Sequence, residues 1–354
     1  MDFQQILGGF KQAIDQQLSQ YFETIIDDIS HKDPLLAKAL LQTQKIALAG
    51  GKRIRGALLQ TAYFGAGGKE KEKILQVACA IELLHLFFLI HDDIIDKGNL
   101  RHGEQTLQNF FAKEQGGEKA DLHYGNSMAL IVGDLLFAKA NELILQAGFA
   151  EGRTLKALQY LQSLVATTIL GQTQDISIEF GDQITVEKVL EMYEHKTAQY
   201  TFAGPLQLGL ILAGKESETE IVEIFAQYAS AIGKAYQIQD DLLGVFADSR
   251  KLGKSTVSDI EEGKQSLLVV FAKLKADELD KGKMTELLGR KNLTENEIAR
   301  FKDILIRTGA KQEAVLLAEQ YLKIGKQVLE KVSLDDEAKF FLMALVEYLE
   351  GRET

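Results

Sequence analysis

Apolar residues recur at helical spacing along most of the chain, and this pattern predicts a protein built of helices. We expect one amphipathic helix over residues 3–29 and another over 34–48, with Pro34 near its start. Residues 122–178 stay helical in pattern, and residues 278–349 predict three or four further amphipathic helices. In the first helix the apolar positions are Phe3, Ile6, Leu7, Phe10, Ile14 and Leu18.

Helix breakers are scarce, which strengthens the all-helical prediction. The chain of 354 residues contains only two prolines, Pro34 and Pro205, and 46% of its residues are hydrophobic, enough for a sizeable core. Turns are expected at residues 65–68 and around 115–117, but neither is long enough to separate domains. The sequence therefore predicts a single all-α domain, a helical bundle over residues 1–354.

Charge and cysteine content narrow the class of protein. A net charge of −11 argues against nucleic acid as a partner, because a basic face is needed to neutralise phosphates. The only cysteine, Cys79, excludes an intramolecular disulfide and fits a reducing compartment. Residues 1–20 mix charged and apolar positions, unlike a signal peptide, and the apolar runs are interrupted short of the ~20 residues that span a bilayer. We expect a cytoplasmic protein without a membrane span.

Candidate chemistry begins at the end of an apolar run, IELLHLFFLIHDDIID, at residues 81–96. Asp92 and Asp96 lie four residues apart and therefore on one face of a helix, while Asp93 is rotated by about 100° from Asp92. Carboxylates so close together repel one another unless a divalent cation lies between them, and Mg²⁺ prefers such oxygen ligands. A solvated acidic helix end would explain this motif equally well if it stood alone.

A second acidic motif follows about 145 residues later, where Asp240 and Asp241 again end an apolar helix. Two such clusters can face each other across a cavity and hold one group of metal ions. Those ions can in turn bind a diphosphate, the leaving group of an allylic substrate. The pair of motifs therefore predicts a metal-dependent enzyme that acts on diphosphates.

With these two motifs, in this order and at this spacing, the chain resembles the trans-isoprenyl diphosphate synthases (polyprenyl synthetases) over roughly residues 40–275. The resemblance implies a single-domain bundle of the isoprenoid synthase type around a central cavity. It also implies a homodimer and a short-chain prenyltransferase, which condenses isopentenyl diphosphate with an allylic diphosphate by ionisation, condensation and proton loss. Three Mg²⁺ ions are expected per active site, with Mn²⁺ as an alternative.

The resemblance assigns the remaining charged motifs to substrate binding. In GGKRIR, at residues 50–55, Lys52 and Arg55 match positions that hold isopentenyl diphosphate, assisted by His85. If a helix starts here, both side chains can point one way. Arg101 is expected at the allylic diphosphate. His102 stands where the family usually has a second arginine, and it would give isopentenyl diphosphate a weaker, pH-dependent contact. A basic loop and a core histidine are the ordinary alternatives.

The middle of the chain supplies further candidates. Gln172 and Asp175 lie three residues apart, so both can face the metal cluster, with Asp175 as a possible ligand. Lys196 and Thr197 resemble the KT pair of the family, in which the lysine touches the allylic diphosphate and the hydroxyl lies near the reacting carbons. For Thr197 the alternative is a hydroxyl bonded back to a helix carbonyl with a small kink. Gln237 is expected to hydrogen-bond around the site.

The second acidic motif departs from DDxxD, because Gly244 replaces the last aspartate. The resemblance assigns Asp240 as a metal ligand and Asp241 as a weaker or indirect one. Lys254 is expected to neutralise the departing diphosphate, and Lys264 matches a second basic position. A surface role is the alternative for both lysines.

Two aromatic residues bear on product length. Phe87 and Phe88 precede Asp92 by five and four residues, so a growing apolar tail that runs along this helix would meet their rings. In the family, aromatics at both positions go with a farnesyl product, whereas the DDLLGVFAD segment looks more like geranylgeranyl enzymes of archaeal type. The sequence favours farnesyl diphosphate, with geranylgeranyl diphosphate as the alternative. Two filled core positions would look the same.

Two other functions fit parts of the pattern. A terpene cyclase also carries DDxxD in a helical bundle, but the second aspartate pair and GGKRIR argue against it. A catalytically silent subunit, or an acidic cation-binding scaffold, would be expected to have lost ligands. Product chromatography distinguishes the cyclase from the synthase, and magnesium-dependent release of diphosphate distinguishes the scaffold.

Overall fold

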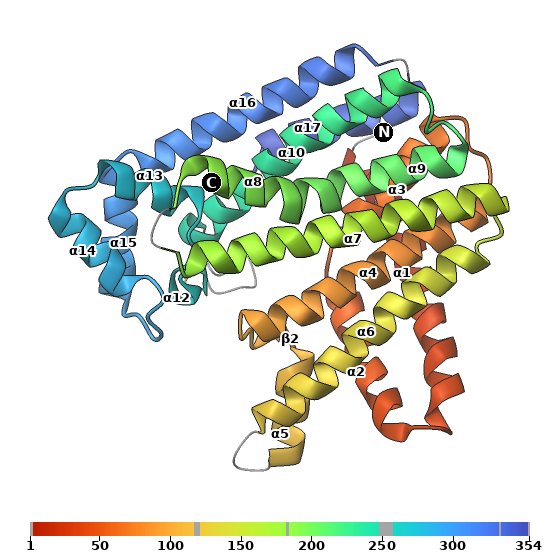
Figure 1. The fold of residues 1–354 in the computed structure, drawn as a ribbon, viewed down its shortest axis with the longest axis horizontal. Helices are drawn as coiled ribbons and strands as arrows, with labels where there is room; N and C mark the ends of the chain where they lie inside the picture. The colour runs from red at the N-terminus through yellow and green to blue at the C-terminus, as the bar shows by residue number, and fades with distance from the viewer. Residues whose placement is uncertain (1–2, 117–120, 182–183, 248–257, 333, 353–354) are drawn as a thin grey trace. The chain divides into compact units, whose positions relative to one another are not determined.

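The structure, a computed structural model, describes residues 3–116, 121–181, 184–247, 258–332 and 334–352. Almost all of the described chain is helical, which confirms the all-α prediction (Figure 1). The chain divides into two compact units: Met1–Leu158 with Ile211–Gly214, and Gln159–Leu210 with Lys215–Thr354. The single domain expected from the sequence stays a prediction.

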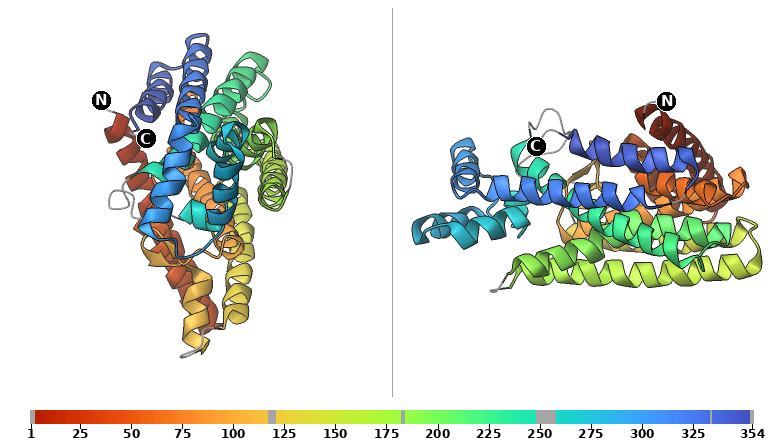
Figure 2. Two further views of the ribbon diagram at one scale, coloured as in Figure 1. Left: turned by 90° about the vertical axis from the view of Figure 1, so that its left-hand side faces the viewer. Right: turned by 90° about the horizontal axis from the view of Figure 1, so that it is seen from above.

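The first unit is built around one buried helix. It contains α1 (Phe3–Ser30), α2 (Pro34–Ala49), α3 (Ile54–Gly65), α4 (Lys71–Ile95), the short strands β1 (Leu100–Arg101) and β2 (Glu104–Gln105), α5 (Leu107–Gly116) and α6 (Leu122–Gln146). Helix α4 packs against α1, α3 and α6 (Figure 1). The helices α1 to α6 are coloured red to yellow in the two further views (Figure 2). Asp33 caps α2 by accepting hydrogen bonds from the N–H groups of Leu35 and Leu36, and Pro34 begins the helix as expected.

Helix α4 differs from the expectation that every apolar run of the chain is too short to span a bilayer. Its 25 residues are long and apolar enough, by length and composition alone, to cross a membrane. In the structure, however, 67% of its most apolar stretch is buried inside the fold. Since its neighbours α1, α3 and α6 cover it, its apolar character is that of the core helix of a globular unit.

The second unit is built around α10 (Thr219–Phe246), which packs against α16 (Ala310–Glu330) (Figure 1). Helices α7 (Glu151–Glu179) and α9 (Gly204–Ala213) begin in one unit and end in the other. The other elements of the second unit are α8 (Val186–Tyr193), the π-helix η1 (Glu194–Ala203), α12 (Ser258–Glu262), α13 (Leu267–Lys275), α14 (Glu278–Leu287), α15 (Glu295–Arg307) and α17 (Asp336–Glu350). The sequence predicts three or four helices over residues 278–349, and the described part of this segment contains four, α14 to α17.

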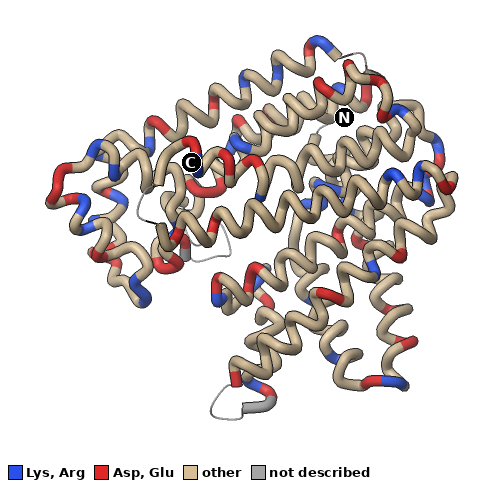
Figure 3. Tube along the Cα trace, viewed as in Figure 1, with Lys and Arg blue, Asp and Glu red and all other residues tan. Residues whose placement is uncertain are grey.

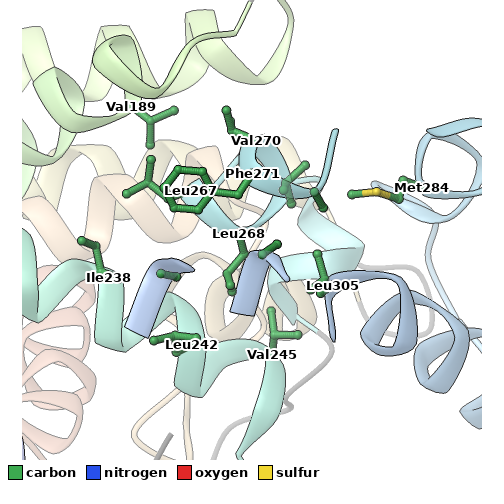
Figure 4. Packing of buried hydrophobic residues seen from close by; sticks show 14 of the residues in the cluster. Val189, Ile238, Leu242, Val245, Leu267, Leu268, Val270, Phe271, Met284 and Leu305 are labelled. Atoms are coloured by element: carbon green, nitrogen blue, oxygen red, sulfur yellow. The ribbon is translucent and has the colours of Figure 1, made fainter. Parts of the chain in front are cut away.

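Buried aliphatic side chains join the helices of the second unit. Ile238, Leu242 and Val245 of α10 lie in one apolar cluster with Leu267 and Leu268 of α13 (Figure 4). This cluster fixes α10 immediately beside its acidic end, because Ile238 and Leu242 flank Asp240 and Asp241 in the sequence. Charged residues of both signs are interleaved along the helices (Figure 3).

Candidate active site

The first acidic motif lies on the last turn of α4. Asp96 caps the helix, and its N–H donates to the carbonyl of Asp92 at 2.8 Å, so the two half-buried carboxylates are one turn apart. Asp93 is only 5% exposed and accepts hydrogen bonds from the guanidinium of Arg101, with Nε at 3.2 Å from Oδ1. The structure thus pairs Asp93 with Arg101, and a metal-ligand role for Asp93 stays a prediction.

Arg101 is held by these acids. Burial alone would lower its pKa, but the charge and the hydrogen bond of Asp93, assisted by Asp92 and Asp96, raise the pKa of Arg101 above its ordinary value. The guanidinium therefore stays positively charged beside the motif. A permanent positive charge at this point suits an anionic ligand.

The donor set of the motif fits Mg²⁺. Within the described residues, His, Cys, Asp and Glu side chains form no group of three or more that could hold a metal by itself. Mg²⁺ does not need one, because it is usually held by one or two carboxylates together with substrate phosphates and water. Asp92 and Asp96, one turn apart on α4, provide two such carboxylates.

Basic groups gather around His85 on α4. Desolvation lowers the pKa of His85 well below its ordinary value, and the positive charges of Arg55, Arg101, Arg53 and His102 lower it further. The imidazole is therefore neutral at pH 7, inside a cluster of fixed positive charge. These groups lie on α4, on α3 and the loop before it, and on the β1–β2 hairpin, and this concentration of basic side chains suits an anionic ligand.

The loop before α3 differs from the expected helix start. Helix α3 begins at Ile54, so the exposed Lys52 precedes the helix and does not share a helical face with Arg55. Arg53 occupies the N-cap with φ 56°, in the left-handed region that residues with a side chain rarely adopt. The segment is thus a shaped loop followed by a helix.

His102 lies in the tight turn between β1 and β2. His102 and Gly103 have φ values of 54° and 83°, as the two central residues of a type I′ hairpin do. A Cβ at Gly50 would lie 2.6 Å from Cγ of His102, so the imidazole packs directly on the glycine loop. The hairpin thereby brings His102 beside the loop that carries Lys52.

In the second unit, Lys196 and Thr197 lie on the π-helix η1. Lys196 Nζ donates to Asp175 of α7 at 2.6 Å, and Gln172 lies one turn earlier on α7, half-buried. Thr197 Oγ1 donates to Gln237 of α10 at 2.7 Å. The threonine hydroxyl therefore bonds to a side chain of α10 and not to a carbonyl of its own helix, and the helix that carries it is a π-helix.

The second acidic motif is the centre of a hydrogen-bond network. Gln237 Nε2 donates to Asp241 at 3.0 Å, and the hydroxyl of the fully buried Tyr193 donates to the other oxygen of Asp241. Burial raises the pKa of Asp241 to about 7, with Asp259 and Asp240 adding to the effect and the two hydrogen bonds opposing it. Asp241 is thus held from two sides, which suits the indirect role expected of it.

Asp240 pairs with the end of the chain. Arg352 Nη2 donates to Asp240 at 2.7 Å, and the guanidinium carbon lies 5.1 Å from the centre of the Tyr236 ring. Asp240 and Asp241 therefore have different neighbours, and Asp240 faces a cation in this structure.

Gly244 has a structural explanation. A Cβ at Gly244 would lie 2.0 Å from Oδ2 of Asp259, so the Asp259 carboxylate occupies the space that a side chain at the last position of the motif would need. Lys264 lies 3.5 Å from Asp259 and 2.9 Å from Glu262. Lys254, the stronger of the two lysine predictions, lies outside the described residues.

Phe87 packs as a core residue. Its ring is 8% exposed and lies 4.8 Å from Phe88, 4.7 Å from His91 and 5.4 Å from Phe137 of α6, measured between ring centres. Phe88 is half-buried on the same helix. The two rings thus belong to an aromatic cluster that joins α4 to α6.

Comparisons with known proteins show the family to which the chain belongs. The family model described as polyprenyl synthetase matches residues 37–305, a span that includes both acidic motifs and the basic loop. The chain belongs to the polyprenyl synthetase family.

Individual relatives are similar over nearly the whole chain. The geranylgeranyl diphosphate synthase of Saccharolobus solfataricus is 31% identical over 327 residues, 90% of this chain and 93% of that protein. The short chain isoprenyl diphosphate synthase of Methanothermobacter thermautotrophicus is 32% identical over 353 residues, 100% of this chain and 99% of that protein. The crystal structure of geranylgeranyl pyrophosphate synthase from Corynebacterium glutamicum, complexed with isoprenyl diphosphate and magnesium, matches with a TM-score of 0.89 and 28% identity, covering 100% of both chains.

Sequence reasoning missed several residues around the motifs of this polyprenyl synthetase. Arg53 and Tyr193 lie beside motif residues in the sequence, but their hydrogen bonds to Glu82 and Asp241 are visible only in three dimensions. Asp259 lies in the DIEEGK segment beside Lys264, and its acidity was the available signal. Arg352 is 112 residues from Asp240, and the sequence near it carries no motif.

Proposed function

We propose that this protein is a geranylgeranyl diphosphate synthase, which extends an allylic diphosphate with isopentenyl diphosphate. Family membership and the short-chain isoprenyl and geranylgeranyl synthases among its relatives support prenyl transfer. The relatives support the geranylgeranyl product better than the farnesyl product that the sequence favours. The packing of Phe87 against Phe137 and His91 agrees, because a ring held in a helix-to-helix core need not block a tail.

In the first unit, the basic cluster would bind diphosphate groups. Arg55 and Lys52 would hold isopentenyl diphosphate, with His85 as a neutral hydrogen-bonding partner and His102 as a further contact. Because the pKa of His85 is lowered, the imidazole can donate or accept a hydrogen bond without adding a titrating charge near pH 7. Arg101 would hold the allylic diphosphate, oriented by its bonds to Asp93.

In the second unit, Lys196 would neutralise charge on the departing diphosphate. Its present partner Asp175 lies 2.6 Å away and keeps the ammonium in place. Thr197 and Gln237 would line the reacting carbons, and Lys254 and Lys264 would add positive charge. With the substrate carbons held at bonding distance, the chain needs no nucleophile of its own.

Divalent metal use follows from the family and from the magnesium in the Corynebacterium glutamicum complex. Asp92, Asp96 and Asp240 would hold the metal, with Asp93, Asp175 and Asp241 as weaker candidates. When bound, Mg²⁺ supplies positive charge that stabilises the leaving diphosphate. The number of three ions, the use of Mn²⁺ and the sharing of ions by the two motifs stay predictions.

The homodimer implied by the family resemblance also stays a prediction, as does the cytoplasmic location. A dimer would give twice the mass of 39.3 kDa in solution, which light scattering during gel filtration measures directly. A monomeric mass at working enzyme concentration would contradict the dimer without affecting the proposed chemistry.

The match of the family model across both acidic motifs carries the proposed function. The test incubates the purified protein with Mg²⁺, labelled isopentenyl diphosphate and dimethylallyl diphosphate, and separates the dephosphorylated alcohols by chromatography. Geranylgeraniol is expected as the end product. Asp92→Asn should remove activity, whereas the matched control Asp121→Asn, at the N-cap of α6, should retain it.

Each other outcome has a definite meaning. Farnesol as the end product would overturn the geranylgeranyl assignment and support the hypothesis that the rings of Phe87 and Phe88 limit the length of the tail. A cyclised hydrocarbon would indicate a terpene cyclase. No prenyl alcohol from any allylic primer, in folded protein, would overturn the synthase assignment in favour of a silent subunit.

A further inference from the structure

A buried arginine holds the loop between the two candidate ligands of isopentenyl diphosphate. Arg53 is 5% exposed, and its Nε donates to Asp15 Oδ1 at 2.7 Å. Its Nη1 donates to Glu82 Oε2 at 3.3 Å, and its Nη2 donates to the carbonyl of Ala47. The three partners lie on α1, α4 and α2, so one guanidinium connects the loop to three helices.

The backbone on either side of Lys52 is in a conformation that needs such support. Gly51 has φ 91° and Arg53 has φ 56°, so both neighbours of Lys52 lie in the left-handed region. For Arg53 this conformation is unfavourable, because its Cβ crowds the backbone. The Arg53 side chain also folds back over the loop, since a Cβ at Gly51 would lie 3.1 Å from its Nη1.

Glu82 extends the same support to the start of α3. This carboxylate is 2% exposed, and while Oε2 accepts from Arg53, Oε1 accepts from the N–H of Gly56 at 3.3 Å. Arg55 therefore lies between two residues that are held by one buried carboxylate on α4. Since α4 also carries His85, the pair of Arg53 and Glu82 ties both sides of the basic cluster to one helix.

We infer that Arg53, through its contacts with Glu82 and Asp15, is a positioning residue for isopentenyl diphosphate, which sets the geometry of Lys52 and Arg55. The inference rests on the proposed function. Burying an ion pair is a poor way to gain stability, because desolvation cancels much of the attraction. Arg53 lies in the loop between Lys52 and Arg55, so the ion pair of Arg53 and Glu82 can position these two candidate phosphate ligands. Arg53 does not itself touch the substrate.

Two variants separate geometry from charge. Arg53→Lys keeps the positive charge but loses the planar fork that reaches three partners. The double variant Arg53→Met with Glu82→Gln removes both members of the most buried pair, and the remaining partner, Asp15, is partly exposed and keeps its ion pair with Lys11. The matched control is Tyr63→Phe, which removes a buried hydroxyl that accepts from Glu70 N–H at the other end of α3.

The measurement is the KM for isopentenyl diphosphate, the KM for the allylic substrate, kcat and the melting temperature of each variant. Arg53→Lys and the double variant should each raise the KM for isopentenyl diphosphate about tenfold, within the ~100-fold that a shift of about 1 Å can cause. The allylic KM and kcat should change less than about threefold, since these depend on groups outside the loop. Tyr63→Phe should lower the melting temperature with no selective effect on either KM.

Two results would overturn the inference. One is an unchanged KM for isopentenyl diphosphate in both variants. The other is a normal KM in Arg53→Lys with a raised KM in the double variant, because charge and not geometry would then matter. A failure of the proposed function looks different: wild type without activity, or Lys52→Ala and Arg55→Ala with an unchanged KM for isopentenyl diphosphate.

Discussion

The position of Lys196 and Thr197 depends on two glycines, and replacing one of them should reduce catalysis without removing any candidate catalytic group. At Gly171 of α7 an added Cβ would lie 2.4 Å from the backbone N of Lys196 and 2.7 Å from its Cα. At Gly233 of α10 it would lie 2.3 Å from the Cα of Ala198. The π-helical backbone of η1 therefore passes close to a glycine on each of two helices.

The magnitude follows from these distances. An ordinary contact of a Cβ begins near 3.4 Å, so Gly171→Ala must displace the backbone of Lys196 by about 1 Å. Overpacking of this kind costs about 1–3 kcal/mol of stability. A displacement of about 1 Å at a catalytic group can reduce kcat by ~100-fold. We expect kcat to fall by about that factor, with a smaller change in the KM for isopentenyl diphosphate, which the first unit is proposed to bind.

The assay compares kcat and the melting temperature of Gly171→Ala and Gly233→Ala with those of Gly325→Ala. The control residue lies on α16, where an added Cβ would meet Cδ1 of Ile232 at 2.4 Å, an equally close contact made with a side chain outside η1. The reasoning is refuted if the two η1-facing variants keep wild-type kcat while they remain folded. It is equally refuted if Gly325→Ala lowers kcat as much as they do.

Three further expectations follow from single contacts. Phe87→Ala should lower the melting temperature and leave the wild-type prenyl alcohol unchanged on chromatography, because the ring fills the core between α4 and α6; a longer alcohol would show that the ring limits the tail. We expect Arg352 to compete with Mg²⁺ for Asp240, and a partly exposed ion pair contributes up to about 1 kcal/mol. Arg352→Gln should therefore lower the Mg²⁺ concentration for half-maximal activity by up to about fivefold. An unchanged Mg²⁺ titration would show that the two do not compete. A histidine whose pKa is lowered in the folded state destabilises the protein below pH ~6.5, because the unfolded state binds the proton more tightly. His85→Gln should therefore lose less stability than wild type between pH 7 and pH 5, as measured by thermal unfolding. An equal loss in variant and wild type would contradict this expectation.

Local pattern was sufficient for much of the fold. The helix expected over 3–29 is α1, Phe3–Ser30, and that expected over 34–48 is α2, Pro34–Ala49. In both, apolar residues at helical spacing face a core, and in α2 the start is set by Asp33 and Pro34. The acidic motifs were equally visible, because ligands one turn apart on a helix are also close together in the sequence.

Conformations that depend on distant partners were beyond local pattern. The sequence suggested that Lys52 and Arg55 share a helix face, but the left-handed Arg53 delays the start of α3 to Ile54. That conformation is supported by Asp15 and Glu82, which lie 38 and 29 residues away. Helical propensity alone would have extended α3 backwards. The π-helix η1 is a similar case, since its close approach to Gly171 is set by packing.

The replacement of the last aspartate of the second motif by Gly244 shows how such distant contacts change the meaning of a motif. Read locally, the glycine removes a carboxylate and weakens the acidic motif. In the structure, the Asp259 carboxylate lies in the space beside Gly244, and its charge helps to raise the pKa of Asp241. Gly244 therefore makes room for a carboxylate from α12, and the acidic character of the site is kept. Restoring the local motif with Gly244→Asp would place a second carboxylate against Asp259, where like charges at short distance repel.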